Sequence, residues 1–79
     1  MTTYRAAVGS VLREARREAG LTQREVAEAA LVTQSSISNY EAGKRDVLLE
    51  TFDRIAVSLG TTARALLDRV DRVETGRAA

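Results

Sequence analysis

A run of small polar side chains near the middle of the chain carries the chemistry that this sequence offers. From Thr33 to Tyr40 no residue is charged, although 29% of the whole chain is charged. The segment "TQSSISNY" presents amides and hydroxyls, which donate and accept hydrogen bonds over a short reach. Gln and Asn match the paired donor and acceptor of adenine, Ser takes either role, and a Thr methyl can touch the methyl of thymine. These groups are therefore suited to contact the edges of nucleobases.

A helix over this segment would sort its side chains onto two faces. At about 100° per residue, Ile37 and Tyr40 fall together on the side that would pack inward. The opposite, outward side carries Gln34, Ser35, Ser38 and Asn39. An exposed face that serves only solubility usually carries Glu and Lys. We therefore expect the outward side to read bases in the major groove; the alternative is a helix of indifferent polar residues.

Glycines and apolar periodicity predict an all-α chain. Proline is absent, and Gly20, Gly43, Gly60 and Gly76 each follow a helix-periodic segment, where a left-handed residue can end a helix. No alternation typical of strands appears. We expect five helices in one domain over 1–74, with a flexible tail at 75–79.

The second and third expected helices are close enough to form a helix-turn-helix at about 22–41. Thr22 and Glu25 form a T-x-x-E capping box at the start of the second helix. Only residues 31–33 then remain before the third helix, over about 34–40. Two short capped helices joined by about three residues are the sequence form of a helix-turn-helix, and the alternative is a hairpin in an ordinary bundle.

The core is expected on the apolar stripes of the first, second and fourth helices. These stripes contain Val8, Val11, Leu12, Ala15 and Ala19, then Val26, Ala27 and Ala30, then Leu49, Phe52, Ile55, Ala56 and Leu59. Their 3–4 spacing is that of amphipathic helices.

Cations should flank a base-reading face, because phosphates surround the major groove. Arg24 lies on the second helix, and Lys44 and Arg45 directly follow the third. Gln23 could donate to a phosphate beside the start of the second helix. The alternative for the segment "GKR" is an ordinary solvated turn.

Composition excludes several other kinds of site. The chain contains neither Cys nor His, which leaves no disulfide, no Cys/His metal site and no evident cofactor or small-molecule ligand. An enzyme would have to use Ser or Tyr40 as nucleophile, without a Gly-rich phosphate loop or paired carboxylates beside it. No apolar run has membrane-spanning length, and the first residues lack a signal peptide's apolar stretch. We expect a cytoplasmic protein that is not an enzyme.

A further apolar stripe in the fifth expected helix predicts a homodimer. Leu66, Leu67, Val70 and Val73 recur at 3–4 spacing, and a small domain has little left to cover them. An uncovered stripe usually marks a partner surface, so Leu66, Val70 and Val73 are the expected dimer interface. The alternative is that Leu66 and Leu67 fill the core while Val70 and Val73 stay in solvent.

The segment "GLTQREVAEAALVTQSSISNYEAGKR" resembles the Cro/repressor-type helix-turn-helix family of DNA-binding regulators, also called the XRE type or lambda-repressor-like family. The pattern G-L-T-Q-x-x-[LV]-A, followed by A-x-V-[ST]-x-x-x-I-S and an aromatic-Glu-x-Gly end, covers 20–43 closely and about 8–67 loosely. Within the family, "KRDVLLETF" is similar to the controllers of restriction–modification systems; a phage repressor or a chromosomal regulator is the alternative.

The resemblance implies a five-helix domain whose third helix enters the major groove. It assigns base reading to Thr33, Gln34, Ser35, Ser38 and Asn39, and phosphate binding to Gln23, Lys44 and Arg45. It also implies a structural ion pair between Arg16 and Glu41.

Two positions depart from the family pattern. Leu31 stands where relatives usually have glycine, and a left-handed leucine costs roughly 1–2 kcal/mol, so the turn could be reshaped. Val47 and Leu48 replace the usual Pro and Ser/Thr before the fourth helix, where Asp46 could act as the cap instead.

Together these observations predict a regulator of transcription, expected to be a repressor. It would bind double-stranded DNA sequence-specifically as a homodimer on a pseudo-palindromic operator, without membrane or cofactor. The alternative is a protein-interaction module, such as an antitoxin, that uses the helix-turn-helix as a scaffold.

Overall fold

A computed structural model describes residues 3–78 of the chain, with the side chains of 3–73. Its helices, in chain order, are α1 (Tyr4–Glu18), α2 (Gln23–Ala30), α3 (Gln34–Glu41), α4 (Leu49–Ser58) and α5 (Ala63–Ala78). The all-α fold is confirmed. The expected tail at 75–79, and with it Gly76, lies outside the residues whose side chains are described.

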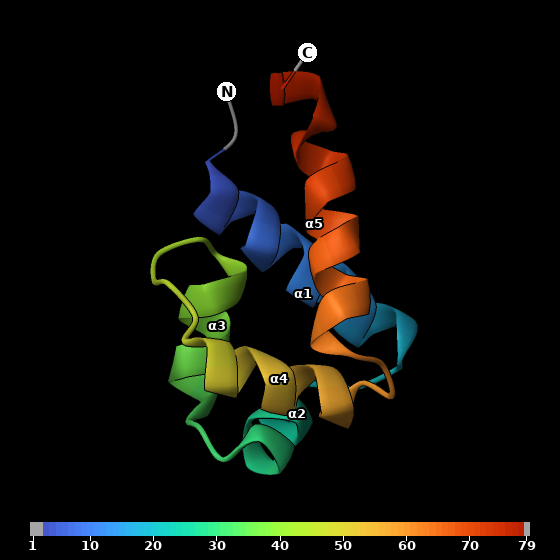
Figure 1. Ribbon diagram of the computed structural model, residues 1–79. Coiled ribbons are helices and arrows are strands. Elements are labelled where there is room, and N and C mark those ends of the chain that lie inside the picture. Colours follow the sequence, from blue (N-terminus) through green and yellow to red (C-terminus); the bar gives the residue numbers. More distant parts are fainter. Residues whose placement is uncertain (1–2, 79) are drawn as a thin grey trace.

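The helices pack as a single bundle (Figure 1). α1 contacts both α3 and α5, and α1 and α5 run in opposite directions along one side of the molecule. α2 packs against α3 and α4, and α4 also contacts α5. No helix in the described part of the chain has the length and apolar character needed to cross a membrane.

The core forms where the apolar stripes of all helices meet. Its largest fully buried side chains are Ile55, Leu66, Val11, Val26 and Val70. The expected inward residues of α2 are all buried, as are Phe52, Ile55 and Ala56 of α4. Ala19 and Leu49 are exposed instead, because α1 ends before Ala19 and Leu49 lies on the outer side at the first turn of α4.

The turn between α2 and α3 keeps a left-handed residue despite the missing glycine. Leu31 has φ 62° and ψ 39°, and its side chain is 79% exposed. Arg54 of α4 supports this turn by donating from Nε to the carbonyl oxygen of Ala30 at 2.8 Å. The turn thus keeps the left-handed geometry that glycine would adopt. Packing around the turn offsets the free-energy cost of a left-handed leucine.

A glycine allows α1 to cross the end of α3. A Cβ built at Gly9 would lie against the carbonyl oxygen of Tyr40 and 2.7 Å from that of Glu41. The missing side chain at Gly9 thus permits this crossing.

The start of α4 lacks the cap that was expected from Asp46. Leu48 is the N-cap residue, and no side chain hydrogen-bonds to the first turn. The carboxylate of Asp46 instead accepts hydrogen bonds from Nε and Nη2 of Arg5, at 2.8 and 3.3 Å. This expectation was wrong because a partner on α1 competes for the carboxylate.

Candidate nucleic-acid interface

The outward side of α3 carries polar groups that have no partner among residues 3–73. Gln34, Ser35 and Ser38 are exposed, and Asn39 is half-buried. Within the described residues, none of these four side chains makes a hydrogen bond or ion pair. Their donors and acceptors are therefore available to a ligand, and no carboxylate lies among them to repel phosphate.

Thr33 is the N-cap residue of α3, and its hydroxyl hydrogen-bonds within the first turn of the helix. Its Oγ accepts from the backbone N–H of Ser36 at 3.0 Å and donates to the Ser36 hydroxyl at 3.0 Å. Such an N-cap satisfies a donor that the first turn leaves free. The methyl of Thr33 remains for a contact with a base, which is the role that its type suggested.

Arg45 is held against the side of α3. One of its Nη atoms donates to the Ser36 hydroxyl at 3.3 Å, and its guanidinium lies 5.5 Å from the centre of the Tyr40 ring. Cation–π contacts of this kind fix a guanidinium without neutralising it. Arg45 therefore presents a positioned positive charge at one edge of the outward face.

The other expected phosphate contacts differ in how free they are. Arg24 and Lys44 are exposed and make no ion pair within the described residues. Gln23 is half-buried, and its Nε2 donates to Oε1 of Glu41 at 3.1 Å. Only its remaining N–H and the backbone at the start of α2 are left for a phosphate.

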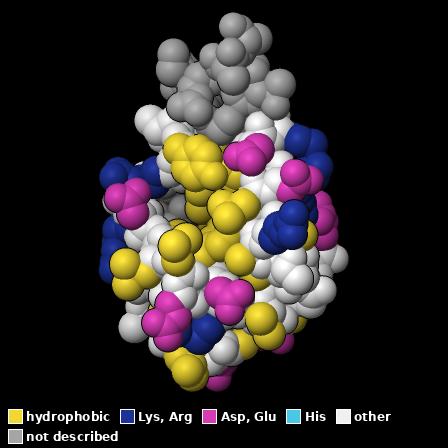
Figure 2. All heavy atoms as spheres, viewed as in Figure 1, with side chains coloured by type: hydrophobic (Ala, Val, Ile, Leu, Met, Phe, Trp, Pro, Cys, Tyr) yellow, Lys and Arg dark blue, Asp and Glu magenta, His cyan; other side chains and the backbone are white. Residues whose placement is uncertain are grey.

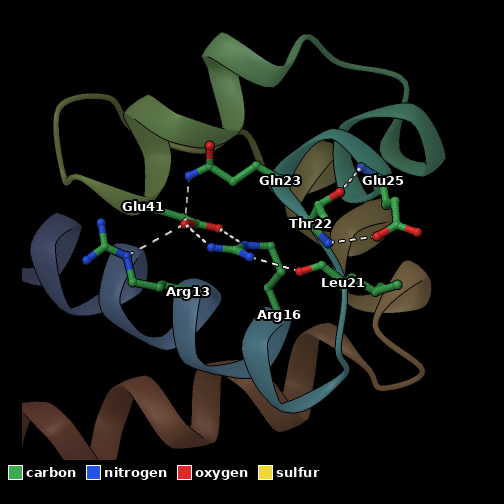
Figure 3. Close-up of polar contacts among 7 residues, drawn as sticks. All are labelled: Arg13, Arg16, Leu21, Thr22, Gln23, Glu25 and Glu41. Atoms are coloured by element: carbon green, nitrogen blue, oxygen red, sulfur yellow. Dashed lines mark hydrogen bonds and ion pairs between the residues drawn. The ribbon is translucent and has the colours of Figure 1, made fainter.

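A buried carboxylate holds the end of α3 against α1 and α2 (Figure 3). Arg16 donates to Glu41 through two nitrogens, Nε to Oε2 at 2.7 Å and Nη2 to Oε1 at 3.1 Å. Arg13 approaches the same carboxylate at 3.7 Å. The side chain of Glu41 is 2% exposed and that of Arg16 is 13% exposed. The expected ion pair is present and almost fully enclosed.

The same cluster also ties in the chain before α2. Arg16 donates from Nη1 to the carbonyl oxygen of Leu21 at 2.9 Å. Directly after it, Thr22 and Glu25 form the predicted capping box, with both of its hydrogen bonds present. The start of α2 is therefore fixed to α1 and α3 together.

The pKa of Glu41 reflects two opposing causes. Burial raises it, while hydrogen bonds from Arg16 and Gln23 and the charges of Arg16 and Arg13 lower it. The lowering causes win, and the pKa of Glu41 lies below its ordinary value. The carboxylate is ionised and acts as a structural anchor rather than as an acid or base.

The predicted dimer interface was wrong for two of its three residues. Leu66 and Val70 are 1% and 0% exposed within the single chain, because α5 packs against α1 and α4. Only Val73, at 49%, offers surface to a partner. The apolar stripe of α5 thus completes the core.

Ser36 and Arg13 belong to the geometry around α3 but were not assigned roles from the sequence. Ser36 was one serine among three, and Arg13 one arginine in a charged run. No spacing rule distinguishes a serine that hydrogen-bonds to a distant arginine. The position of Ser36 beside Tyr40 on the helical wheel was the one available signal.

Comparison with known proteins places this arrangement of helices in a known family. The sequence pattern of the helix-turn-helix family HTH_3 matches residues 12–66, which is more than half of the chain. The chain belongs to this family. The family and the fold are those of DNA-binding transcriptional regulators, which are not enzymes.

Among the relatives of this helix-turn-helix protein, HTH-type transcriptional regulator DdrOP3 from Deinococcus deserti is 37% identical over 60 residues. Those residues make up 76% of this chain but 46% of that relative's length. The helix-turn-helix protein thus spans less than half of this relative.

Solved structures match over most of the chain. The clp gene regulator ClgR from Corynebacterium glutamicum has a TM-score of 0.91 at 30% identity, covering 98% of this chain and 82% of that one. The restriction-modification controller protein C.AhdI from Aeromonas hydrophila has a TM-score of 0.75 at 31% identity, covering 77% and 92%. Similarity to a controller agrees with the resemblance seen in "KRDVLLETF".

Proposed function

We propose that this helix-turn-helix protein regulates transcription by binding double-stranded DNA sequence-specifically, with α3 in the major groove. The observation that carries the proposal is the outward side of α3. Gln34, Ser35 and Ser38 are exposed there and have no hydrogen-bond partner among the described residues. Asn39 and the Thr33 methyl border them. A helix that contacts base edges in the major groove needs hydrogen-bond donors and acceptors on short side chains that are not already paired. A helix that serves only solubility has no such requirement.

Positive charges at the edges of this side would fix the protein on the phosphates. Arg24 on α2, and Lys44 and Arg45 after α3, are exposed. The N-terminus of α2, with Gln23, adds backbone N–H groups that favour an anion. Phosphate contacts of this kind set orientation and make affinity fall steeply as salt rises.

The regulator would act as a homodimer on a pseudo-palindromic operator. One α3 reads only a short half-site, and a two-fold pair doubles the site that is read. The names of the relatives, a clp gene regulator and a restriction-modification controller, support a regulatory role. Repression follows if the bound dimer blocks polymerase. Such a protein would work in the cytoplasm, on the nucleoid.

Selection of bound DNA from a random pool, read by sequencing, tests the proposal. It should return a half-site and its spacing. Gln34→Ala should then weaken binding to the selected site by about 1–3 kcal/mol and relax one base position. Equal loss on all sequences would show that Gln34 binds phosphate, and no enrichment of any sequence at low salt would overturn the proposal.

Arg24→Ala provides the contrasting variant, with Arg64→Ala as its matched control. Loss of a phosphate contact should weaken all sequences alike and reduce the salt slope by about 1. Arg64 is also exposed but lies on α5, so its removal makes the same charge change away from α3. If both variants behave alike, α2 does not lie against the DNA backbone.

A further inference from the structure

Two arginines approach the carboxylate of Glu41, although one of them already satisfies it. Each oxygen of that carboxylate accepts a hydrogen bond from Arg16, and Oε1 also accepts one from Gln23. Nε of Arg13 lies 3.7 Å from the same Oε1, which is too far for a hydrogen bond. The side chain of Arg13 makes no hydrogen bond among the described residues. These four residues, which we call the Glu41 cluster, therefore carry one positive charge in excess.

The excess charge is that of Arg13, because Arg13 lies at the surface. Its side chain is 45% exposed, whereas those of Arg16 and Glu41 are 13% and 2% exposed. Arg16 and Glu41 are opposite charges in direct contact, so their fields largely cancel a few ångströms away. The guanidinium of Arg13 is thus available to a ligand, and the buried carboxylate does not repel an anion there.

Several other arginines have a carboxylate of their own. On the face shown in Figure 2, basic side chains lie next to acidic ones on both margins of an apolar band. Arg5 pairs with Asp46, and Arg72 with Asp68, each at 2.8 Å. Exposed pairs of this kind contribute little to stability, and they leave little net charge for a ligand. Arg13 differs from them because the one carboxylate within its reach is shared with Arg16.

Arg13 also lies beside the start of α2, where a phosphate contact is proposed. Figure 3 shows Arg13 of α1 and Gln23 of α2 reaching the same carboxylate from two helices. Their nitrogens lie 3.7 and 3.1 Å from Oε1 of Glu41, so the two side chains are neighbours. Gln23 donates one N–H to that oxygen, and its second N–H has no acceptor among the described residues. A charged and a neutral donor are therefore available at one place.

This pair of donors suits a phosphate. A guanidinium forms charge-assisted hydrogen bonds to phosphate oxygens, and an amide N–H can add a further bond to the same group. Both kinds of donor contact the phosphates of DNA in protein complexes, and such contacts fix orientation without reading sequence.

We infer that Arg13 binds a phosphate of the DNA backbone together with Gln23, so that α1 joins α2 and α3 in the interface. This contact rests on the proposed function, because DNA is the source of the phosphate. Arg13 also lowers the pKa of Glu41, so a contact with DNA has to be separated from a purely structural role.

The salt dependence of DNA binding tests the contact with a matched pair of variants. Arg13→Gln removes the charge, and Arg64→Gln makes the same change at an exposed position of α5. In Arg13→Gln, affinity should fall roughly tenfold at about 0.1 M salt on every sequence, and the slope of log affinity against log salt should decrease by about 1. Arg64→Gln should leave both unchanged. An unchanged slope in Arg13→Gln, or equal changes in both variants, would overturn the inference.

Two further measurements exclude an indirect effect through Glu41. Arg13→Gln should shift the urea midpoint little at neutral pH, since Arg16 and Gln23 still hydrogen-bond to the carboxylate. Arg13→Lys keeps the positive charge and should restore the salt slope of the wild type. A slope that stays reduced in Arg13→Lys, or an affinity that falls only as far as the folded fraction falls, would contradict a contact with phosphate.

A scan of the DNA backbone identifies the phosphate. Single methylphosphonate linkages, which are neutral, are placed one by one along the selected site. One position in each half-site should weaken binding by the wild type but have no further effect on Arg13→Gln, and its effect should be smaller on Gln23→Ala. Free phosphate bound at Arg13 would leave all linkages alike. If every position keeps its full effect on Arg13→Gln, the contact is absent.

The same experiments separate this contact from the proposed function. If the wild type selects a sequence and Arg13→Gln binds that sequence equally well at every salt concentration, the Arg13 contact alone is overturned. If the wild type prefers no sequence but its salt slope decreases in Arg13→Gln, sequence-specific binding alone is overturned.

Discussion

The two sides of α3 have opposite roles, although they belong to one helix of eight residues. On the inner side, Glu41 is buried and every oxygen of its carboxylate accepts a hydrogen bond. On the outer side, Gln34 and Ser38 are exposed and make no hydrogen bond among the described residues. The inner side fixes the position of the helix through hydrogen bonds that are already formed. The outer side has donors and acceptors that are still available to a ligand. Changes on the inner side should therefore appear as stability, and changes on the outer side as affinity.

Glu41→Ala should have the largest effect on stability. It would leave Arg16 partly buried without its partner, at a cost of about 3–5 kcal/mol. Urea denaturation followed by circular dichroism would measure the loss. Replacing both partners, with Arg16→Met and Glu41→Leu, should cost less than Glu41→Ala alone. If the double variant is the less stable of the two, the charge left behind is not the cause.

Acid should weaken the inner side through the same carboxylate. The pKa of Glu41 is below its ordinary value of 4.5, so the folded state binds this proton less readily than the unfolded state. The stabilisation is therefore fully present above pH 4.5 and is lost as the pH falls through the lowered value. Urea midpoints measured through this range should fall with pH in the wild type and fall less in Glu41→Gln. Glu28→Gln, at an exposed position, should keep the wild-type dependence.

Gly9→Ala should destabilise the protein by about 1–3 kcal/mol, as overpacking does. The added methyl would meet the backbone oxygens of Tyr40 and Glu41, which cannot rotate away as a flexible side chain can. Thermal unfolding would measure the change. Ser10→Ala, at the next and exposed position of α1, is the control and should change stability little. Equal effects at both positions would show that helix propensity, rather than the crossing, is responsible.

Leu31→Gly should stabilise the protein by about 0.5–1 kcal/mol. Glycine removes the left-handed cost of roughly 1–2 kcal/mol, and its greater freedom in the unfolded chain returns part of that gain. The same residue introduced by Ala29→Gly, inside α2, should instead cost about 1 kcal/mol. The urea midpoints should move in opposite directions; a fall in both would mean that the leucine side chain contributes contacts that outweigh its backbone strain.

Substitutions on the outer side of α3 should have the smallest effect on stability. Ser35→Ala and Ser38→Ala remove hydroxyls that have no partner in the described structure, so unfolding should change by no more than about 0.5 kcal/mol. Their affinity for the selected DNA should nevertheless fall. A loss of stability comparable to that of Gly9→Ala would contradict the division between the two sides.

Local patterns predicted the helices and their caps because those depend on nearby residues. Thr22 with Glu25, and Thr33 at the start of α3, are recognisable within one turn of helix. Helical spacing also separated Ile37 from Gln34 and Ser38, since the wheel depends only on position along the chain. Partnerships between helices were less accessible. The pair Arg16–Glu41 was expected only through the family resemblance, and Asp46 was assigned to the wrong partner.

The assignment of Leu66 and Val70 to a dimer interface was wrong for a related reason. A stripe such as Leu66 and Val70 indicates that one face of α5 must be covered, but not what covers it. The core of α1 and α4 does so here, which leaves Leu49 outside although its spacing on α4 placed it inside.

By itself, the sequence determined the helix boundaries, the charge-free outer side of α3 and the family, because periodicity, capping and motif spacing are encoded in adjacent residues. Only the tertiary structure decided that Gly9 admits the end of α3, that Arg45 lies against Ser36, and which leucines remain exposed. Those outcomes depend on which helix faces meet in space, and the free energy of packing chooses among pairings that the local pattern leaves equal.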